Sequence, residues 1–328
     1  MNLRSLIAAL PDASVSGAGD PQISGIVADS RRVQEASLFV AIAGGSVDGH
    51  RFIGDAIGRG AAAVVGEKDL AAALSVPYVR VADGRAALAQ LAAAWHGFPA
   101  RRLRVIGVTG TDGKTTTTTF IHAILTASGE KAGMVSTVAA VIGDRQLDTG
   151  LHTTTPDALD MQEYLDEMVA AGSAYAVLET TSHGLHQKRV DACEFDMGVI
   201  TNITHEHLDY HGTFENYREA KATLFRMLST TARKPGMPKI AVLNADDPSY
   251  GYLRAIPADR HISYALDAAA DVTATDIIES AGAQRFTAHT PGGRFAVHIA
   301  LPGRYNVANA LAAIGAAQTA LISLTGSL

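Results

Sequence analysis

Apolar residues recur along this chain in short runs separated by polar turns, which is the pattern of a fold in which strands and helices alternate. Up to about residue 98 the runs are short. They predict strands at residues 24–28, 38–42 and 62–65 and helices at residues 52–60 and 86–95. The segment 96–102 breaks the pattern with glycine, proline and two arginines. We therefore expect a small N-terminal α/β domain over residues 1–98 and a larger domain over residues 99–328.

Beyond residue 102, apolar strand-like runs alternate with longer helical patterns. The predicted strands are residues 105–108, 132–136, 175–179, 197–201 and 240–244, and the predicted helices are residues 115–127, 157–171 and 213–228. This alternation predicts a mostly parallel sheet covered on both faces. For the second helix, Thr155 is the expected N-cap and Pro156 the first helical residue. A small antiparallel extension (strands 286–290 and 295–300) and a helix at residues 306–321 complete the expected α/β fold.

One stretch joins a predicted strand to a predicted helix through a loop that carries two glycines. It reads Gly110, Thr111, Asp112, Gly113, Lys114, Thr115, Thr116. Glycines let backbone N–H groups approach an anion, and the helix start adds its positive dipole end. Lys114 suits the outer phosphates of a nucleotide, and the Thr115 hydroxyl suits Mg²⁺. The strict phosphate-loop pattern is not met, because Val108 stands where its first glycine belongs. A simple glycine turn is the alternative, but the loop favours a nucleoside triphosphate site.

Two further strand ends carry runs of polar residues, at 179–183 and 201–212. The C-terminal ends of parallel strands face the same crevice as the phosphate loop, so Glu179 and His207 are candidates to reach a metal ion there. A zinc site is the alternative, built from His205, His207, Asp209 and His211. It is less favoured, because a phosphate loop accounts for Mg²⁺ and nothing else in the sequence calls for zinc. In the N-terminal region, the polar segments 29–31 and 44–49 taken alone are read as turns.

Composition narrows the classes of partner. The net charge is −6, with 27 basic against 33 acidic residues, so no general attraction to nucleic acid or to an anionic membrane is expected. The single cysteine, Cys193, excludes an internal disulfide and suits a reducing cytosol. No apolar run approaches the roughly 20 residues of a membrane span, and the one near the N-terminus is too short for a signal peptide. We expect a cytoplasmic, monomeric protein.

Taken together, the motifs resemble those of the Mur ligase family, the ATP-dependent amide-forming enzymes of peptidoglycan precursor synthesis. The resemblance runs from Asp29 to the last residues. It is carried by Asp29-Ser-Arg, the segment from Gly107 to Thr117, Thr153-Thr-Thr-Pro-Asp-Ala, Glu179-Thr-Thr-Ser-His-Gly-Leu, Thr201-Asn-Ile-Thr-His-Glu-His-Leu-Asp-Tyr-His-Gly, Ala220-Lys221, Asn244-Ala-Asp-Asp-Pro and Gly303-Arg-Tyr-Asn-Val-Ala-Asn. Within the family, the Thr-Thr-Pro, Ser-His-Gly-Leu and His-Leu-Asp-Tyr-His-Gly segments favour the tripeptide synthetases.

The resemblance implies a reaction. The terminal carboxylate of UDP-N-acetylmuramoyl-L-alanyl-D-glutamate attacks the γ-phosphate of ATP, and the amine of meso-diaminopimelate or L-lysine then displaces phosphate from the acyl phosphate. The alternatives are the sister ligase that adds D-Ala-D-Ala and a non-catalytic nucleotide-binding fragment. A small-molecule kinase is not favoured, because it would have no use for residues 154–156. GTP is not favoured over ATP, because the sequence contains no guanine-reading Asn-Lys-x-Asp segment. Family members have a third, C-terminal domain for the amino acid, which we expect to be absent from this chain.

The resemblance also implies roles for matching residues. Lys114, Lys221 and His207 are the expected catalytic residues, and Lys221 is expected as a carbamate formed with CO₂. The expected metal ligands are Thr115, Glu179, His207 and carbamylated Lys221. ATP is expected at residues 110–116 and at Asn306 and Asn309. The expected residues for the nucleotide-linked peptide are Ser30, Gly45, Ser46, Val47, Thr153, Thr154, Thr155, Thr181, Gln187 and Arg189. The chain departs from the family pattern at Asp112, where asparagine is usual.

Overall fold

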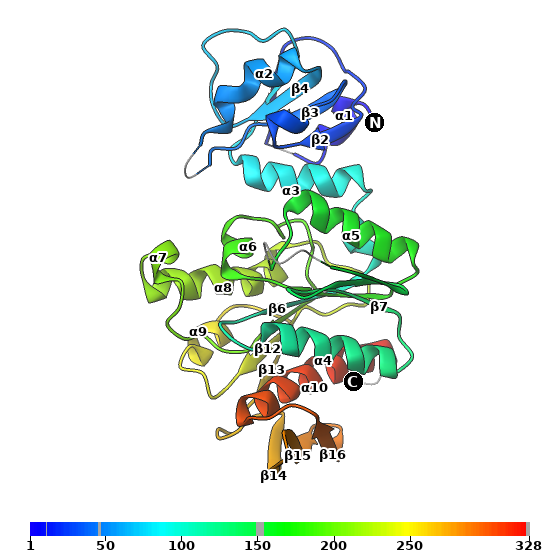
Figure 1. Cartoon of the computed structure of the whole chain (residues 1–328), viewed down its shortest axis with the longest axis vertical. Coiled ribbons are helices and arrows are strands. Elements are labelled where there is room, and N and C mark those ends of the chain that lie inside the picture. The colour runs from blue at the N-terminus through cyan, green and yellow to red at the C-terminus, as the bar shows by residue number, and fades with distance from the viewer. Residues whose placement is uncertain (11, 45–46, 149–153, 326–328) are drawn as a thin grey trace. The chain divides into compact units, whose positions relative to one another are not determined.

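The chain folds into two compact units, each with its own core. The computed structural model describes residues 1–10, 12–44, 47–148 and 154–325, and Figure 1 shows its course. The first unit comprises Met1–Pro99, Asp157–Glu163 and Gln187–Ala192. The second comprises Ala100–Pro156, Tyr164–His186 and Cys193–Leu328. The first unit therefore takes in two short segments from far along the chain, which the sequence did not indicate.

A five-stranded sheet forms the centre of the first unit. Its strands are β1 (Ser14–Ser16), β2 (Gly25–Val27), β3 (Ser37–Val40), β4 (Ala61–Gly66) and β5 (Tyr78–Arg80). Their order is β1-β5-β4-β3-β2, and only β1 runs antiparallel to its neighbour. The helical elements are α1 (Leu3–Ile7), η1 (Ser30–Arg32), η2 (Gly49–Phe52), α2 (Ile53–Gly58) and α3 (Gly84–Trp95).

Both faces of the sheet are buried at the central strands β3 and β4, which explains why these strands read as continuous apolar runs. Leu38 and Val40 of β3 belong to the core cluster that includes Leu6 of α1 and Leu91 of α3. Phe39, between them in sequence, points to the opposite face and belongs to the cluster that includes Ile53 of α2. Successive side chains of one strand thus serve two cores.

An eight-stranded sheet forms the centre of the second unit. Its strands are β6 (Arg104–Thr109), β7 (Ala132–Val135), β8 (Ala140–Ile142), β9 (Arg145–Leu147), β10 (Tyr175–Glu179), β11 (Met197–Ile200), β12 (Ile240–Asn244) and β13 (Arg260–Tyr264). The order is β13-β12-β11-β6-β10-β7-β8-β9, with β8 and β9 antiparallel at one edge. β6 lies between β10 and β11, so its C-terminal end lies beside the ends of both. This arrangement brings the predicted phosphate loop next to Glu179 and to the segment after residue 200.

Helices cover both faces of the large sheet. They are α4 (Lys114–Ala127), α5 (Ala158–Ala170), α6 (Ser182–His186), α7 (Leu208–His211), α8 (Phe214–Thr230), α9 (Tyr250–Arg254) and α10 (Arg304–Thr325). α4 and α10 pack together on one face, and α8 lies on the other (Figure 1). Gly107 of β6 faces α8, and a Cβ there would overlap Leu224 and Phe195. The glycine therefore lets the helix approach the middle strand closely. None of the described helices is both long and apolar enough to cross a membrane.

A separate three-stranded antiparallel sheet precedes α10. Its strands are β14 (Thr273–Ser280), β15 (Ala283–Thr290) and β16 (Gly293–Ile299), in that order. Phe286 and Ala288 of β15 join the large core together with Val307 and Leu311 of α10. The expected fold class, α/β with a mostly parallel sheet and a small antiparallel extension, is confirmed.

One predicted helix start is wrong. Thr155 does not cap α5, because its hydroxyl interacts with the Glu179 carbonyl and the Thr181 hydroxyl. Asp157 caps the helix in its place: its Oδ1 accepts hydrogen bonds from the N–H groups of Leu159 and Asp160, at 3.0 and 3.1 Å. Pro156 accordingly lies before the cap, outside the helix. Thr155, predicted as a helix cap, thus contacts Glu179 and Thr181 at the ends of the strands.

Candidate nucleotide and metal site

The loop between β6 and α4 can be built only with glycine at two positions. Gly110 has φ +150° and Gly113 has φ +78°, both in the region that side chains disfavour. A Cβ at Gly110 would overlap the Thr201 hydroxyl, and a Cβ at Gly113 would overlap the carboxamide of Asn309. Gly113 is also the N-cap of α4 and has no side chain that could accept a hydrogen bond from the first turn. The N–H groups of that turn can therefore donate to an anion.

The segment after β11 holds this loop in place. The N–H of Thr111 donates to the Asn202 carbonyl at 2.8 Å, and the N–H of Asp112 donates to Asn202 Oδ1 at 3.0 Å. The N–H of Thr204 donates in turn to Thr111 Oγ1 at 3.0 Å. Asp112 is exposed. The loop is therefore preorganised by protein groups, as a site for a multiply charged anion requires.

The first turn of α4 carries the side chains expected at the phosphates. Lys114 donates from Nζ to the Thr111 carbonyl at 2.7 Å, so its ammonium lies folded over the loop. The Thr115 hydroxyl lies 3.1 and 3.0 Å from the two carboxylate oxygens of Glu179. Thr116 follows in the same turn and is half-buried. Two residues that the sequence assigned to one metal site, Thr115 and Glu179, are thus in direct contact.

Glu179 ends β10 and is almost completely buried, with 1% of its surface exposed. Besides Thr115, its carboxylate accepts hydrogen bonds from the N–H of Thr137 at 2.9 Å and from the Thr137 hydroxyl at 3.0 Å. Within the described part of the chain, no cationic side chain forms an ion pair with it. A buried carboxylate beside hydroxyl groups offers only oxygen ligands, and hard cations such as Mg²⁺ prefer these. The residues present therefore fit a Mg²⁺ ion.

Lys221 lies directly behind the loop, on α8. It is 1% exposed, and its Nζ donates to the Gly110 carbonyl at 2.5 Å and lies 4.4 Å from the centre of the Tyr217 ring. Burial lowers the pKa of Lys221 well below its ordinary value, and the charge of Lys114 lowers it further. Burial also raises the pKa of Tyr217 to about 12, and its hydroxyl lies 3.1 Å from Thr111 Oγ1. The lowered pKa raises the fraction of Lys221 that is a neutral amine, which is the form that reacts with CO₂.

His207 stands at a strained position near the same tyrosine. Its backbone has φ +53°, which is uncommon for a residue with a side chain. The imidazole is 46% exposed, and its ring centre lies 4.9 Å from that of His183 and 6.2 Å from that of Tyr217. Tyr217 is thus a neighbour of both His207 and Lys221. Among the described residues, no hydrogen bond or ion pair joins His207 or Lys221 to the Thr115–Glu179 pair.

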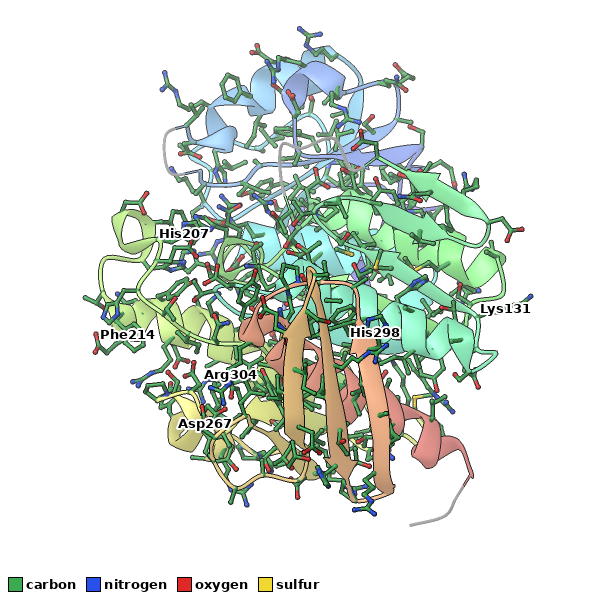
Figure 2. The ribbon with its side chains drawn as sticks, turned by 60° about the horizontal axis from the view of Figure 1, so that its bottom comes forward. Lys131, His207, Phe214, Asp267, His298 and Arg304 are labelled. Carbon is green, nitrogen blue, oxygen red and sulfur yellow. The ribbon has the colours of Figure 1, made fainter. Side chains whose placement is uncertain are left out.

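Histidines gather around α6 and α7, but the geometry does not support a zinc site. His211 is buried between the rings of His183, His186 and Tyr217, and burial lowers its pKa to about 4. His205 instead stacks on Phe214, with ring centres 4.8 Å apart, and Figure 2 labels Phe214 and His207 in this region. Within the described residues, no group of three or more His, Cys, Asp or Glu side chains could hold a metal ion.

Two threonines link Glu179 to α6. The hydroxyls of Thr155 and Thr181 lie 3.1 Å apart, and the N–H of Thr181 donates to Thr155 Oγ1 at 3.0 Å. Thr181 Oγ1 accepts from the N–H of Gly184 at 3.0 Å. Thr154, just before, is half-buried. Of the residues predicted for the peptide substrate, these three therefore lie next to the predicted metal site.

The asparagines of α10 meet the loop from the other side. Asn309 lies against Gly113 and donates from Nδ2 to Asn306 Oδ1 at 3.2 Å. Asn306 donates to the Pro302 carbonyl at 2.7 Å, and both asparagines are 5% exposed. At the start of the helix, Arg304 pairs with Asp267 (Figure 2). Of the two residues expected near the adenine, Asn309 thus contacts the phosphate loop, and Asn306 is its hydrogen-bond partner.

Apart from Thr153, the remaining predicted substrate residues belong to the first unit. Ser30 begins η1, whose N-cap is Asp29. Val47 is exposed, and its carbonyl accepts a hydrogen bond from Gly44. Arg189 donates twice to Gln187 Oε1, at 2.6 and 3.1 Å. Gly45 and Ser46, together with Thr153 in the second unit's part of the chain, lie outside the described residues.

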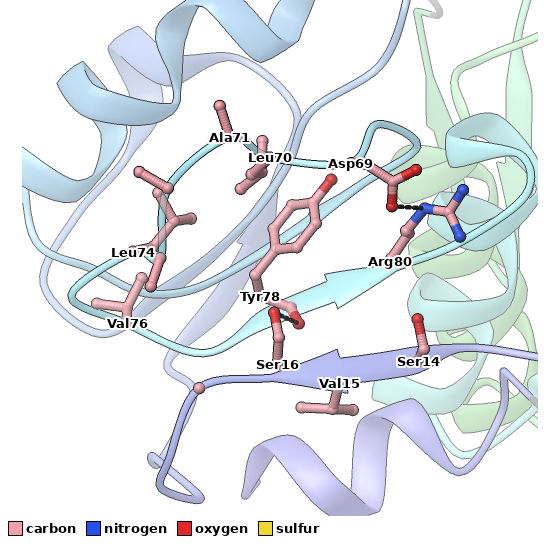
Figure 3. A pocket seen from close by; sticks show the side chains of 13 residues that line it. Ser14, Val15, Ser16, Asp69, Leu70, Ala71, Leu74, Val76, Tyr78 and Arg80 are labelled. Carbon is pink, nitrogen blue, oxygen red and sulfur yellow. Dashed lines mark hydrogen bonds and ion pairs between the residues drawn. The ribbon is translucent and has the colours of Figure 1, made fainter.

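The first unit also contains a cavity of about 360 Å³. It lies over β1 and β5, with Tyr78 projecting into it and the Arg80–Asp69 ion pair (2.9 Å) at one end (Figure 3). Leu70, Leu74 and Val76 form its apolar wall. Among the described residues, none that is predicted to bind substrate lines this cavity, so Ser30 and Val47 lie elsewhere in the unit.

Among the described residues that contact the site but were not predicted are Thr137, Asn202 and Tyr217. A feature of the sequence could have indicated each of these three residues. Tyr217 lies four residues before Lys221 and so on the same helix face. Thr137 directly follows the predicted strand 132–136, which makes it a strand-end residue like Glu179. Asn202 lies within the polar run 201–212 but was not singled out from it.

Two family models and several known proteins match this chain. Residues 108–317 match the family model described as Mur ligase middle domain, and residues 22–96 match the Mur ligase family, catalytic domain. The chain is 44% identical over 324 residues to the UDP-N-acetylmuramoyl-L-alanyl-D-glutamate--2,6-diaminopimelate ligase of Geobacillus kaustophilus. It is 46% identical over 303 residues to the UDP-N-acetylmuramyl-tripeptide synthetase of a Roseiflexus species.

These matches take in most of this chain but only part of each relative. They cover 99% and 90% of the chain, and 65% and 60% of the Geobacillus and Roseiflexus proteins. A solved structure of a UDP-N-acetylmuramoyl-L-alanyl-D-glutamate--2,6-diaminopimelate ligase superimposes with a TM-score of 0.80 at 29% identity, over 98% of this chain and 64% of that one. About a third of each relative thus has no counterpart in the match.

Proposed function

Because this chain belongs to the Mur ligase family, we propose that it forms the nucleotide-binding and acyl-substrate-binding parts of an ATP-dependent amide-forming ligase. The proposed reaction joins an amino acid to UDP-N-acetylmuramoyl-L-alanyl-D-glutamate in peptidoglycan precursor synthesis. The names of the similar proteins favour 2,6-diaminopimelate as the amino acid. L-lysine is the alternative substrate to be tested beside it. The proposed setting is a monomer in the cytoplasm.

One observation carries this proposal. The Thr115 hydroxyl, in the first turn after a glycine loop shaped for anions, contacts the buried carboxylate of Glu179. Thr115 and Glu179 would hold Mg²⁺, with His207 and carbamylated Lys221 as further ligands. Mg²⁺ would neutralise charge on the triphosphate and so allow an anionic carboxylate to approach it.

The residues of the loop have a defined task in this reaction. The substrate carboxylate oxygen forms a bond to the γ-phosphorus as the bond to the β,γ-bridging oxygen breaks, which gives an acyl phosphate and ADP. The amine then attacks the acyl carbon, loses a proton, and releases phosphate. Lys114 and the N–H groups at the start of α4 would stabilise the charge on the phosphates during the first step. The neutral amine of Lys221 accounts for the proposed carbamate, since only the unprotonated form adds CO₂.

We assign the peptide part of the nucleotide-linked substrate to Thr153, Thr154, Thr155, Thr181, Gln187 and Arg189. Ser30, Gly45, Ser46 and Val47 would hold the uridine diphosphate. Support comes from the contacts of Thr155 and Thr181 beside Glu179 and from the names of the relatives.

Calorimetry on the full chain tests the proposal. We expect a non-hydrolysable ATP analogue to bind in the presence of Mg²⁺ and UDP-N-acetylmuramoyl-L-alanyl-D-glutamate to bind independently of it. The matched controls are the corresponding GTP analogue and the UDP-linked substrate to which the sister ligase adds D-Ala-D-Ala. Binding of neither ligand, or preference for either control, would overturn the assignment.

A further inference from the structure

We propose that Asp112 and Gly113 form a site of spontaneous isoaspartate formation, and that a nucleotide bound in the loop protects this site. The chemistry belongs to the chain alone, whereas the protection rests on the proposed function. In an Asp-Gly pair the glycine nitrogen can attack the aspartate carboxyl carbon, because no glycine side chain hinders its approach. The sequence contains three such pairs, which begin at Asp48, Asp83 and Asp112. The structure holds these three pairs in different ways.

The reaction needs no reagent other than water. The Gly113 nitrogen loses its proton and forms a bond to Cγ of Asp112, while the protonated carboxyl group loses its hydroxyl, so that one water leaves. The product is a cyclic succinimide. Water then opens the ring at one of its two carbonyl carbons. Opening at Cγ restores aspartate, and opening at the main-chain carbon gives isoaspartate, in which the main chain runs through Cβ and Cγ.

The first difference between the pairs lies in the glycine N–H groups, which must be free for the nitrogen to attack. The N–H of Gly49 donates to the Ile42 carbonyl at 2.9 Å, and the N–H of Gly84 donates to Glu67 Oε1 at 2.7 Å. Within the part of the chain that the structure describes, the N–H of Gly113 has no hydrogen-bond partner. Its nitrogen is therefore the only one of the three that needs no hydrogen bond to open first.

The second difference lies in the carboxylates. Asp48 Oδ1 accepts from the N–H of His50 at 3.0 Å, and Asp83 Oδ1 accepts from the N–H of Ala86 at 2.9 Å. These bonds turn each carboxylate toward residues beyond its own glycine. Asp112 is exposed, and its carboxylate forms no hydrogen bond or ion pair with any described residue. The Asp112 side chain is therefore free to turn toward the nitrogen of the next residue.

The start of α4 favours the reaction at Gly113 further. Gly113 is the N-cap of this helix, and the positive end of the helix dipole stabilises the negative charge that its nitrogen carries once the proton is lost. Two contacts oppose the reaction. The Asp112 carbonyl accepts from the Thr201 hydroxyl at 2.5 Å and from Asn202 Nδ2 at 3.3 Å, so ring closure requires the loop to move. We therefore expect this pair to react more slowly than in the unfolded chain, but faster than the other two pairs.

A bound nucleotide should change this balance. The start of α4 is the part of the helix that we propose to hold the phosphates, and the free N–H of Gly113 would donate to one of their oxygens. That hydrogen bond would engage the nitrogen and oppose movement of the loop. Conversely, isoaspartate at position 112 adds one carbon atom to the main chain of the loop and displaces the N–H groups that follow. Isomerised protein should therefore bind the nucleotide poorly.

The test ages the full chain in H₂¹⁸O at neutral pH for several weeks, digests it with trypsin in ordinary water and analyses the peptides by mass spectrometry. Trypsin separates the three pairs into the peptides 33–51, 81–85 and 105–114. Each ring opening adds one ¹⁸O atom, and fragmentation distinguishes isoaspartate from aspartate. The same chain in guanidinium chloride gives the rate of each pair without structure. Relative to those rates, we expect peptide 105–114 to isomerise roughly tenfold faster than either other peptide, which is the factor for one hydrogen bond to be opened.

Asp112→Glu is the matched variant, because it keeps the carboxylate but would have to close a larger ring that forms much more slowly. It should remove isomerisation from peptide 105–114 and leave the other two peptides unchanged. Equal relative rates in the three peptides, or a signal in peptide 105–114 that persists in Asp112→Glu, would overturn the proposal. If this variant does not fold, the comparison of the three peptides from the wild-type chain decides alone.

The protection is tested by repeating the experiment with Mg²⁺ and a saturating concentration of a non-hydrolysable ATP analogue. We expect isomerisation in peptide 105–114 to slow by roughly tenfold, with the other two peptides unaffected. An analogue that binds in calorimetry but leaves this rate unchanged would overturn the protection. An analogue that does not bind would overturn the proposed function, and the comparison without ligand would still decide whether the pair isomerises.

Discussion

At the scale of single residues, the ammonium of Lys114 is the charge most directly placed over the phosphate loop. We expect Lys114→Ala to weaken binding of the Mg²⁺–ATP analogue by roughly 10- to 100-fold, since a hydrogen bond to a charged group contributes about 1.5–3 kcal/mol. Calorimetric titration measures this. Lys131→Ala removes an exposed lysine beyond the other end of α4, and this variant should bind normally. Equal affinities of wild type and Lys114→Ala would show that the loop does not hold the phosphates.

A second residue-scale prediction concerns Lys221. Its burial favours the neutral amine, so the protein in ¹³C-labelled bicarbonate at neutral pH should give a carbamate carbon signal. Lys221→Arg should abolish that signal, because a guanidinium does not form the adduct under these conditions. NMR spectroscopy measures both samples. The same spectrum from the two proteins would mean that the lysine is unmodified.

Motifs in the sequence identified the loop and Glu179, but they could not predict which residues contact them. Glycine spacing and the strand–helix boundary are local signals, and they placed Lys114 and Thr115. The Thr137–Glu179 contact depends on which strands are neighbours, and β7 and β10 are about forty residues apart in the sequence, which no local pattern reports. Lys221 read by itself is a solvated helix lysine. Only the resemblance indicated it, and its burial could not be read from the sequence.

At the scale of elements, Gly113 joins the loop to two helices, as N-cap of α4 and contact of Asn309 on α10. Gly113→Ala should lower the free energy of unfolding and abolish nucleotide binding. Gly129→Ala is a matched control, because Gly129 also has a positive φ, at the end of α4, with open space around it. The control should show only the backbone cost of about 1–2 kcal/mol. Urea unfolding compares the two, and equal losses would contradict the packing role of Gly113.

Another element-scale prediction concerns a buried charge cluster at the N-terminal ends of the strands. Asp196, just before β11, pairs with Lys234 at 2.5 Å and with Lys239 at 3.2 Å, and all three residues are buried. Asp196→Ala leaves two buried ammonium groups without their anion, so we expect a loss of about 3–5 kcal/mol in urea unfolding. Asp166→Ala, which breaks the exposed pair with Arg102, should cost far less. A similar small effect of both changes would contradict the burial of these charges.

The elements that sequence predicted are those with strong apolar runs. Every predicted strand and helix occurs, with ends shifted by a few residues. Those it missed are short or polar: β1 is exposed along its whole length, and β9 is nearly so. The order of strands also could not be read, because parallel neighbours such as β6 and β11 are joined through other strands.

At the scale of the whole molecule, the chain corresponds to about two thirds of its relatives. We expect the isolated chain to bind the nucleotide-linked substrate and ATP but to release phosphate slowly. Supplying the remaining third of the Geobacillus protein as a separate polypeptide should raise amino-acid-dependent phosphate release by roughly 10³-fold, through positioning of the amine and exclusion of water. A coupled phosphate assay measures both conditions. Fast turnover by the chain alone would show that these parts suffice.

The segments 157–163 and 187–192, which return to the first unit, have a practical consequence for dissecting this protein. A protease that cuts near residue 98 leaves two pieces whose chains still share one folded body, since part of that body is encoded after the cut. The pieces should therefore migrate together in a native sizing column and separate only under denaturing conditions. For the same reason, a gene fragment ending at residue 99 encodes an incomplete core that lacks Ala158 and Ala192. The unit is compact in space, but no single uninterrupted stretch of sequence encodes all of it, so it cannot be expressed alone or exchanged as one segment.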